Sequence, residues 1–193
     1  FDESSLRDFH ENDVWGGLRA MLDCDVPIVA QIEGNCMGAG VEIACCCDIR
    51  IAADSARFGA PIARLGFPMA PRETALVLRE AGALTAREML LQAAVLGAPE
   101  MKARGFLNQI VADGATKGAA LAIAQQVAAL APQAAHLNKR TLRALNQASA
   151  LSENTISATD PVANAIRNAY QYADSAEHRE GIDAFMQKRK PMF

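Results

Sequence analysis

The amino-acid sequence predicts an α/β fold with a helical C-terminal portion, and three observations support this prediction. Short apolar runs typical of buried strands alternate with helical patterns over residues 1–113. Residues 114–193 show helical patterns alone. Neither an internal repeat nor a low-complexity linker interrupts the chain. We therefore expect a β/α core over residues 1–113 that continues into a helical region over residues 114–193.

The first expected elements are a helix and a strand. Residues 4–22 have the spacing of an amphipathic helix, with their apolar side chains on one stripe. Residues 27–32 form an apolar run typical of a short strand buried on both faces. We expect this strand to run into the small-residue turn Gly38-Ala39-Gly40, which opens an apolar helix ending near Cys47.

The later elements follow from local signals. Pro71 is typical of the first turn of a helix, and the pattern from Thr85 to Glu88 is that of a capping box. Residues 61–69 read as a loop. The remaining expected strands are residues 48–53, 57–59 and 106–111, and the remaining expected helices are residues 99–105, 119–130, 132–150, 161–173 and 176–190.

Composition excludes several classes of function. The 193 residues are 51% hydrophobic and 21% charged, with a net charge of −3, which is ordinary for a globular protein. This mild acidity argues against a nucleic-acid partner. No apolar run reaches about eighteen residues, so no membrane span is expected. The first residues lack the pattern of a signal peptide, and a cytoplasmic location is expected.

The cysteines and histidines do not form a recognisable metal site. Three of the five cysteines are consecutive, a spacing that suits neither a tetrahedral metal site nor a disulfide framework, and we expect small buried hydrophobes in a reducing compartment. The three histidines are far apart in sequence, and we expect them at the surface or at helix edges. These residues are Cys24, Cys36, Cys45, Cys46, Cys47, His10, His136 and His178.

The most informative stretch is GNCMGAGVEIACCCD, at residues 34–48. A small-residue turn that opens a helix leaves backbone N–H groups free at the positive end of the helix dipole. Such groups can hold a developing oxyanion, and Glu42 lies three residues beyond Ala39, on nearly the same face of the first turn. The alternatives are a plain tight turn at Ala39 and a glutamate kept at Glu42 for capping.

Two stretches of the chain resemble the crotonase (enoyl-CoA hydratase/isomerase) superfamily. The first is PIVAQIEGNCMGAGVEIACCCDIRIAADSARFGAPIARLGFP, and the second is the C-terminal REGIDAFMQKRKPMF. The family has G-x-x-x-G-[GA]-G-x-E/D-L followed by F-x-x-P-E, and ends in REG-x-x-A-F-x-E-K-R-x-P-x-F. The resemblance implies a crotonase-like ββα spiral core. It also implies that an earlier part of the family domain, which supplies the second oxyanion-hole N–H, is not in this sequence.

The resemblance implies roles for particular residues. The Ala39 N–H would hold the enolate oxygen of an acyl-CoA thioester, and Glu42 would be a catalytic glutamate whose pKa rises through desolvation. Phe185 and Lys188 match positions that contact coenzyme A, commonly from a neighbouring subunit; a basic last turn that complements the helix dipole is the alternative for Lys188. The full set of implied substrate-binding positions is Met37, Gly38, Pro61, Ile62, Leu65, Phe185 and Lys188.

The chain departs from the family at the second catalytic glutamate. Where hydratases read F-G-x-P-E, this sequence has Ile62, and isoleucine cannot hydrogen-bond a water molecule. The glycine-rich turn that normally follows is rewritten and contains Arg72 and Glu73. Glu73 or Arg64 could reach the pocket and compensate; the alternatives are a helix-start carboxylate and a solvated arginine.

The sequence therefore favours an enzyme of the enoyl-CoA hydratase/isomerase type with Glu42 as general acid/base. One carboxylate suffices to move a proton between two carbons, so double-bond isomerisation is chemically easier than hydration. Decarboxylation, thioester hydrolysis and catalytically impaired acyl-CoA binding are the alternatives motivated by Ile62. By resemblance we expect a homotrimer or hexamer, and no separate cofactor because coenzyme A is part of the substrate.

Overall fold

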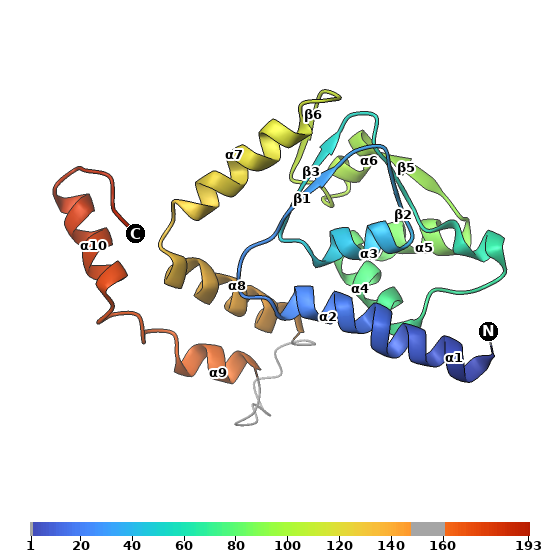
Figure 1. Cartoon of the computed structure of the whole chain (residues 1–193), viewed down its shortest axis with the longest axis horizontal. Coiled ribbons are helices and arrows are strands. Elements are labelled where there is room, and N and C mark those ends of the chain that lie inside the picture. Colours follow the sequence, from blue (N-terminus) through green and yellow to red (C-terminus); the bar gives the residue numbers. More distant parts are fainter. Residues whose placement is uncertain (1, 148–160) are drawn as a thin grey trace. The chain divides into compact units, whose positions relative to one another are not determined.

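The computed structural model describes residues 2–147 and 161–193 (Figure 1). They form two compact units. The first unit comprises the residues up to Cys24 together with Ile28–Ile123, and the second comprises Asp25–Pro27 together with Ala124–Phe193. Within the described residues, no helix is long and apolar enough to cross a membrane.

The first unit begins with one helical rod made of three segments. These are α1 (Glu3–Asp8), the π-helical segment η1 (Phe9–Val14) and α2 (Trp15–Asp23). The Asp2 carboxylate caps the rod by accepting a hydrogen bond of 2.8 Å from the Ser5 backbone N–H. The predicted helix over residues 4–22 is confirmed. The π-helical segment in its middle was not predicted, because one extra residue per turn over so short a segment hardly changes the spacing of the apolar side chains.

The six strands form two three-stranded sheets. In the first sheet β3 lies between β1 and β6, and all three strands are parallel; in the second β4 pairs in parallel with β2 and antiparallel with β5. The strands are β1 (Val29–Ile32), β2 (Asn35–Met37), β3 (Ile49–Ala53), β4 (Arg57–Gly59), β5 (Val95–Gly97) and β6 (Gln109–Val111).

From β1 to β4 the strands alternate between the two sheets, and β5 then joins β4 in the second sheet. After β1 the chain turns at Gly34, whose φ of +63° is a conformation that glycine adopts without strain, and it enters β2 in the second sheet. The predicted strand over residues 27–32 is confirmed by β1, but β2 separates it from the turn at Gly38. Neither β2 nor β5 was predicted, because three residues give no readable alternation of apolar and polar side chains.

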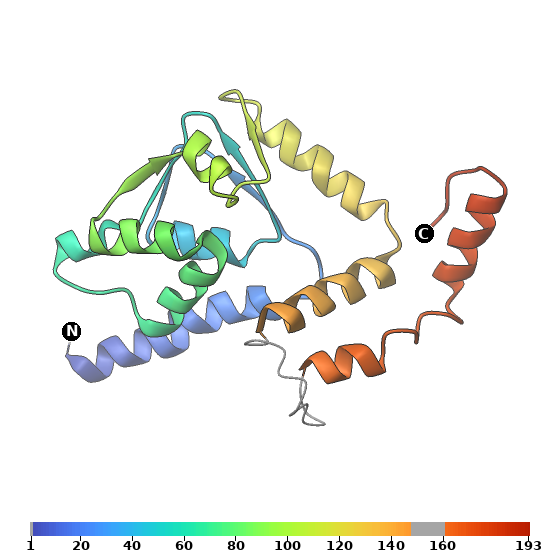
Figure 2. The same ribbon diagram turned by 180° about the vertical axis from the view of Figure 1, so that it is seen from behind.

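Helices fill the connections between the strands. Figures 1 and 2 show α3, α4 and α5 gathered on one side of the strands, next to α2. The capping box at Thr85 is wrong: α5 starts after Gly82, and Thr85 is a buried residue inside the helix. The elements are α3 (Ala39–Cys46), the 3₁₀ helix η2 (Pro61–Leu65), α4 (Pro71–Ala81), α5 (Ala83–Leu91) and α6 (Ala98–Ala103).

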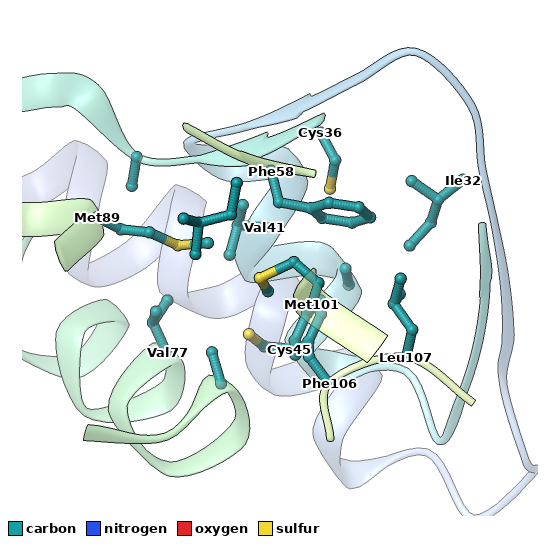
Figure 3. Packing of buried hydrophobic residues seen from close by; sticks show 14 of the residues in the cluster. Ile32, Cys36, Val41, Cys45, Phe58, Val77, Met89, Met101, Phe106 and Leu107 are labelled. Atoms are coloured by element: carbon teal, nitrogen blue, oxygen red, sulfur yellow. The ribbon is translucent and has the colours of Figure 1, made fainter. Parts of the chain in front are cut away.

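A single apolar core holds α3 between the strands and the other helices. Val41 and Cys45 of α3 enter the same cluster as Phe58 of β4 and Phe106, whose rings meet edge to face at 6.0 Å between centroids (Figure 3). Val77 of α4 reaches this cluster from the opposite side. The core thus fixes α3 from both sides, so the start of α3 is held by packing as well as by its own hydrogen bonds.

The second unit is helical. The Asp25 carboxylate accepts hydrogen bonds from Arg140 and Arg143 of α8, at 2.8 and 2.9 Å. These contacts lower the pKa of the Asp25 carboxyl to about 2. Helices at the four predicted places are confirmed, although residues 148–150 of the predicted third-last helix lie outside the described residues. The elements are α7 (Thr116–Ala128), which crosses into this unit, α8 (Pro132–Gln147), α9 (Pro161–Arg167) and α10 (Ala176–Met186).

Candidate active site

The start of α3 carries two backbone N–H groups without acceptors. Gly38 caps the helix with φ +50° and ψ −115°, a conformation suited to glycine, and its carbonyl accepts from the N–H groups of Val41 and Glu42 at 2.9 and 3.2 Å. Among the described residues, the N–H groups of Ala39 and Gly40 have no acceptor. Ala39 is exposed and has a negative φ, as expected for a residue that opens a helix. These amides are available to an anion.

Glu42 is a buried carboxylate that makes no hydrogen bond or ion pair within the described part of the chain. It is 6% exposed in the first turn of α3. The pKa of Glu42 is raised to about 7, chiefly by burial and to a smaller extent by the charge of Glu73, while His10 opposes the shift. At neutral pH this side chain therefore exists in both protonation states, which suits a group that takes and returns protons.

A second buried carboxylate, Glu73, lies in the first turn of α4. It is 3% exposed, and its Oε1 lies 2.9 Å from Nδ1 of His10 on η1. The His10 side chain is 28% exposed. Glu73 is thus a helix-start carboxylate, as one of the two sequence-based interpretations had it, and His10, expected at the surface or at a helix edge, is its partner. The two residues are 63 positions apart, and no local pattern connects them.

The start of α4 is fastened to the N-terminal rod by further contacts. Arg72 forms an ion pair with Glu11 at 3.0 Å, and its guanidinium lies over the Trp15 ring at 5.9 Å from the centroid. Together with the His10–Glu73 contact, these interactions join η1 and α2 to the turn in which the sequence departs from the family pattern. The unusual residues of that turn thus have specific partners.

The other predicted substrate-binding residues of the first unit precede α3 or lie between β4 and α4, and they differ in exposure. Met37 ends β2 and is partly buried, next to Gly38. Pro61 and Ile62 begin η2, and Ile62 packs against the apolar core. Leu65 is 72% exposed. Ile62 therefore serves packing where a carboxylate is expected in the family.

The remaining predicted residues lie elsewhere. Phe185 is the last residue but one of α10 and is 79% exposed, and Lys188 is exposed just beyond that helix, both in the second unit. Arg64 is exposed and donates a hydrogen bond of 3.1 Å to the Ala93 carbonyl, as its interpretation as a surface arginine implies. The assignment of Phe185 and Lys188 to coenzyme A stays a prediction.

The cysteines are free thiols in the described structure. Cys36, Cys45, Cys46 and Cys47 are buried, as expected for small hydrophobes. Desolvation raises the pKa of Cys36 to about 11, so this thiol stays protonated and is a poor nucleophile. No cluster of three or more potential metal ligands is found among the described residues.

The fold is that of a known enzyme family. The family model described as "Enoyl-CoA hydratase/isomerase" matches residues 3–193, and the chain belongs to this family. Among curated proteins, 2,3-dehydroadipyl-CoA hydratase from Escherichia coli is 30% identical over 93% of this chain and 66% of its own length. Methylmalonyl-CoA decarboxylase from the same organism is 28% identical over 86% of this chain and 62% of its own length.

Solved structures confirm the crotonase-like fold. An enoyl-CoA hydratase/carnitine racemase from Magnetospirillum magneticum aligns with a TM-score of 0.79 and 35% identity, covering 91% of this chain and 62% of its own. The chain spans slightly less than two thirds of the length of the curated relatives that it matches, 66% and 62% for the two named above. These relatives are named for different reactions, a hydration and a decarboxylation, so family membership alone does not define the reaction.

Proposed function

We propose that this protein catalyses proton transfer next to the carbonyl of an acyl-CoA thioester, in the manner of an enoyl-CoA isomerase or hydratase. The observation that carries the proposal is the buried, unpaired carboxylate of Glu42 one turn after the free amides of Ala39 and Gly40. A thioester carbonyl oxygen received by such amides gains negative charge when its α-carbon loses a proton. A base and an oxyanion site in one helical turn match this requirement.

In the isomerisation of a 3-enoyl-CoA, the Glu42 carboxylate removes a proton from Cα. The electron pair of the broken C–H bond enters the conjugated dienolate, whose charge rests on the carbonyl oxygen near the Ala39 N–H. Protonated Glu42 then returns a proton to Cγ, and the double bond ends between Cα and Cβ. Base and acid are the same residue, so one group with a pKa of about 7 serves both steps at neutral pH.

Hydration of a 2-enoyl-CoA makes a further demand, because a water molecule must be held and deprotonated while Cα is protonated. Ile62 offers no hydrogen bond at the position where hydratases carry a second glutamate. Isomerisation is therefore the first reaction to test and hydration the second. A homologue that binds acyl-CoA without turnover is the alternative that the Ile62 replacement favours.

The second unit supplies the proposed contacts to coenzyme A and to other subunits. Its helices expose large apolar side chains that a free surface rarely gathers, which supports assembly into a homotrimer or hexamer. These side chains include Leu142 at 65%, Ile166 at 63%, Ile182 at 52% and Phe185 at 79% exposure. Light scattering that finds a stable monomer at micromolar concentration would contradict the assembly.

The function is tested with the purified protein, crotonyl-CoA and a 3-enoyl-CoA. We expect turnover of the 3-enoyl-CoA and its loss in Glu42→Gln, which keeps the shape of the side chain. The control is Glu80→Gln, on α4 and paired with Arg79 at the surface. Binding of CoA esters with background rates for both substrates would favour the non-catalytic alternative and refute the enzymatic one.

A further inference from the structure

Two buried carboxylates and one partly exposed imidazole lie on three elements of the first unit, α3, α4 and η1. Glu42 is 6% and Glu73 is 3% exposed, whereas the His10 side chain is 28% exposed. His10 contacts Glu73 directly at 2.9 Å, and α3, which carries Glu42, packs against α4, which carries Glu73. His10 is thus the member of the group that solvent reaches most easily.

The position of His10 depends on the π-helical segment η1. A π-helical turn holds one residue more than an α-helical turn, so it changes the direction of every side chain that follows. His10 lies in η1 and stacks edge to face on Phe9, with 5.4 Å between ring centroids. The Arg72–Glu11 ion pair fixes the same segment to α4. Further contacts of η1 and α4 therefore hold His10 and Glu73 next to each other.

Within residues 2–147 and 161–193, few other charges reach Glu42. Glu73 and His10 are the charged side chains there that act on the pKa of Glu42, in opposite directions. The ionisable groups on the other elements packed against α3 have separate partners or stay neutral: Arg79 pairs with Glu80 on α4, Arg19 pairs with Asp23 on α2, and Cys36 of β2 is a protonated thiol. The three residues thus form an isolated group of their own.

We propose that Glu73, oriented by His10, is a second acid–base residue of this site, which exchanges protons with Glu42 and, through the His10 imidazole, with solvent. This proposal rests on the proposed function of Glu42. It assigns a task to Glu73, which lies in the turn where this chain departs from the family pattern. Two carboxylates close enough to repel each other share one proton more readily than they carry two charges.

The proton balance is simple. After Glu42 has taken a proton from Cα, its carboxylic acid gives a proton to a bridging water molecule, which gives one of its own to the Glu73 carboxylate, since the two carboxyls make no direct hydrogen bond. Glu42 becomes an anion again. Protonated Glu73 passes the proton to neutral His10, and the resulting imidazolium releases it to water. The reverse sequence brings a solvent proton to Glu42. No oxidant, reductant or metal ion takes part, and the net charge of the three side chains returns to its starting value.

The test is the isomerisation of a 3-enoyl-CoA in D₂O, read as deuterium at Cγ of the product by mass spectrometry at low conversion. Without a relay, Glu42 returns the proton that it took, and the product contains little deuterium. We expect wild-type product to carry deuterium, and Glu73→Gln and His10→Asn products to carry severalfold less. Glu80→Gln and His136→Gln are the matched controls and should equal the wild type. Equal deuterium in the wild type and in both relay variants would overturn the proposal.

A second measurement does not depend on turnover. The carboxyl of Glu42, labelled with ¹³C and assigned with Glu42→Gln, is titrated by NMR. Glu73→Gln should lower the pKa of Glu42 because a neighbouring negative charge is removed, and His10→Asn should raise it. An unchanged pKa in both variants would overturn the proposal. His10→Asn changes no residue of α4, so it provides a second reading of the test if Glu73→Gln does not fold.

The two proposals fail in different ways. If the wild type turns over no acyl-CoA, the proposed function is refuted, and the titration of Glu42 alone decides whether the three residues exchange protons. If the wild type is active but its deuterium content does not respond to Glu73 or His10, the proposed function stands and the relay is refuted.

Discussion

Nδ1 of His10 lies 2.9 Å from Oε1 of Glu73, although 63 positions separate the two residues in the chain. The contact joins the π-helical segment η1 to the first turn of α4, and it places a polar pair inside a region that is otherwise apolar. A buried carboxylate without a partner is costly, so the imidazole stabilises Glu73 as well as orienting it. The neighbouring Glu42 has no such partner, and this difference separates the two carboxylates chemically.

Replacing Glu42 by glutamine should abolish most of the activity. The amide cannot accept the Cα proton, and general acid–base groups typically contribute 10²- to 10⁴-fold, so we expect a loss of about that size in kcat for isomerisation. Steady-state kinetics measure it, with Glu80→Gln as the matched control. A loss of less than about tenfold would mean that another group removes the proton.

The rate of the wild-type enzyme should rise with pH. Glu42 must start as a carboxylate to remove the Cα proton, and its pKa of about 7 places the half-maximal value of kcat/KM near neutrality. The measurement is a pH–rate profile with a 3-enoyl-CoA between pH 5 and 9, covering both sides of the pKa. A rate that is flat across this range, or that falls with pH, would show that Glu42 is not the base.

The same residue should make stability depend on pH. The folded protein raises the pKa of Glu42 from 4.5 to about 7, so folding is favoured while this carboxyl is protonated and is weakened as pH rises through that window. The loss amounts to about 3 kcal/mol when complete. Glu42→Gln does not ionise, so its free energy of unfolding relative to the wild type should increase between pH 4.5 and 7 and stay constant above.

Urea unfolding at pH 5 and pH 8 provides the measurement. The two proteins share every other ionisable group, so the difference between their free energies of unfolding reports the ionisation of Glu42 alone. A difference that does not change with pH would show that the carboxyl is solvated in the folded protein.

Replacing Ile62 by glutamate restores the residue that hydratases carry at this position. Ile62 packs against the core, so a glutamate there loses apolar contact and should lower the free energy of unfolding by about 1–3 kcal/mol. In return, hydration of crotonyl-CoA should increase relative to isomerisation, because a water molecule gains a hydrogen-bond partner. Ile62→Gln has a similar shape without the charge and serves as the control. A ratio of hydration to isomerisation that is unchanged would place Ile62 outside the site.

Gly59 should tolerate no side chain. A Cβ built on this residue of β4 lies 2.8 Å from the Ala94 backbone oxygen and 3.2 Å from Cγ2 of Val95, so Gly59→Ala must move the β4–β5 pair. We expect a loss of about 1–3 kcal/mol in the free energy of unfolding. The Gly59 carbonyl also accepts from the Gly38 N–H at 2.9 Å, so activity should fall too.

Gly97 on β5 is the matched control. A Cβ on Gly97 meets only Arg57 and Pro99 at 3.7 Å, which is ordinary contact, so Gly97→Ala should be nearly neutral. Equal stability of the two alanine variants would show that the β4–β5 pair adjusts freely.

The sequence by itself determined the features that depend on near neighbours. The order of helices and strands, the turn at Gly38 and the placement of Glu42 in the first turn of α3 all follow from spacing within a few residues, because helix starts and apolar stripes are local patterns. The family was also readable, since its two motifs lie intact at opposite ends of this chain. Burial of the central cysteines followed from their apolar surroundings.

Only the tertiary structure decided the features that depend on distant partners. It separated β2 from β1 and assigned it to another sheet, because strand pairing with β4 outweighs any signal in three residues. It placed Thr85 inside α5, where packing overrides a capping pattern. It brought His10 to Glu73, because contacts between η1 and the start of α4 hold the two residues together across 63 positions. Long-range packing has no signature in a single sequence, so Glu73 could be named as a candidate from the sequence, but its burial and its histidine partner became visible only in three dimensions.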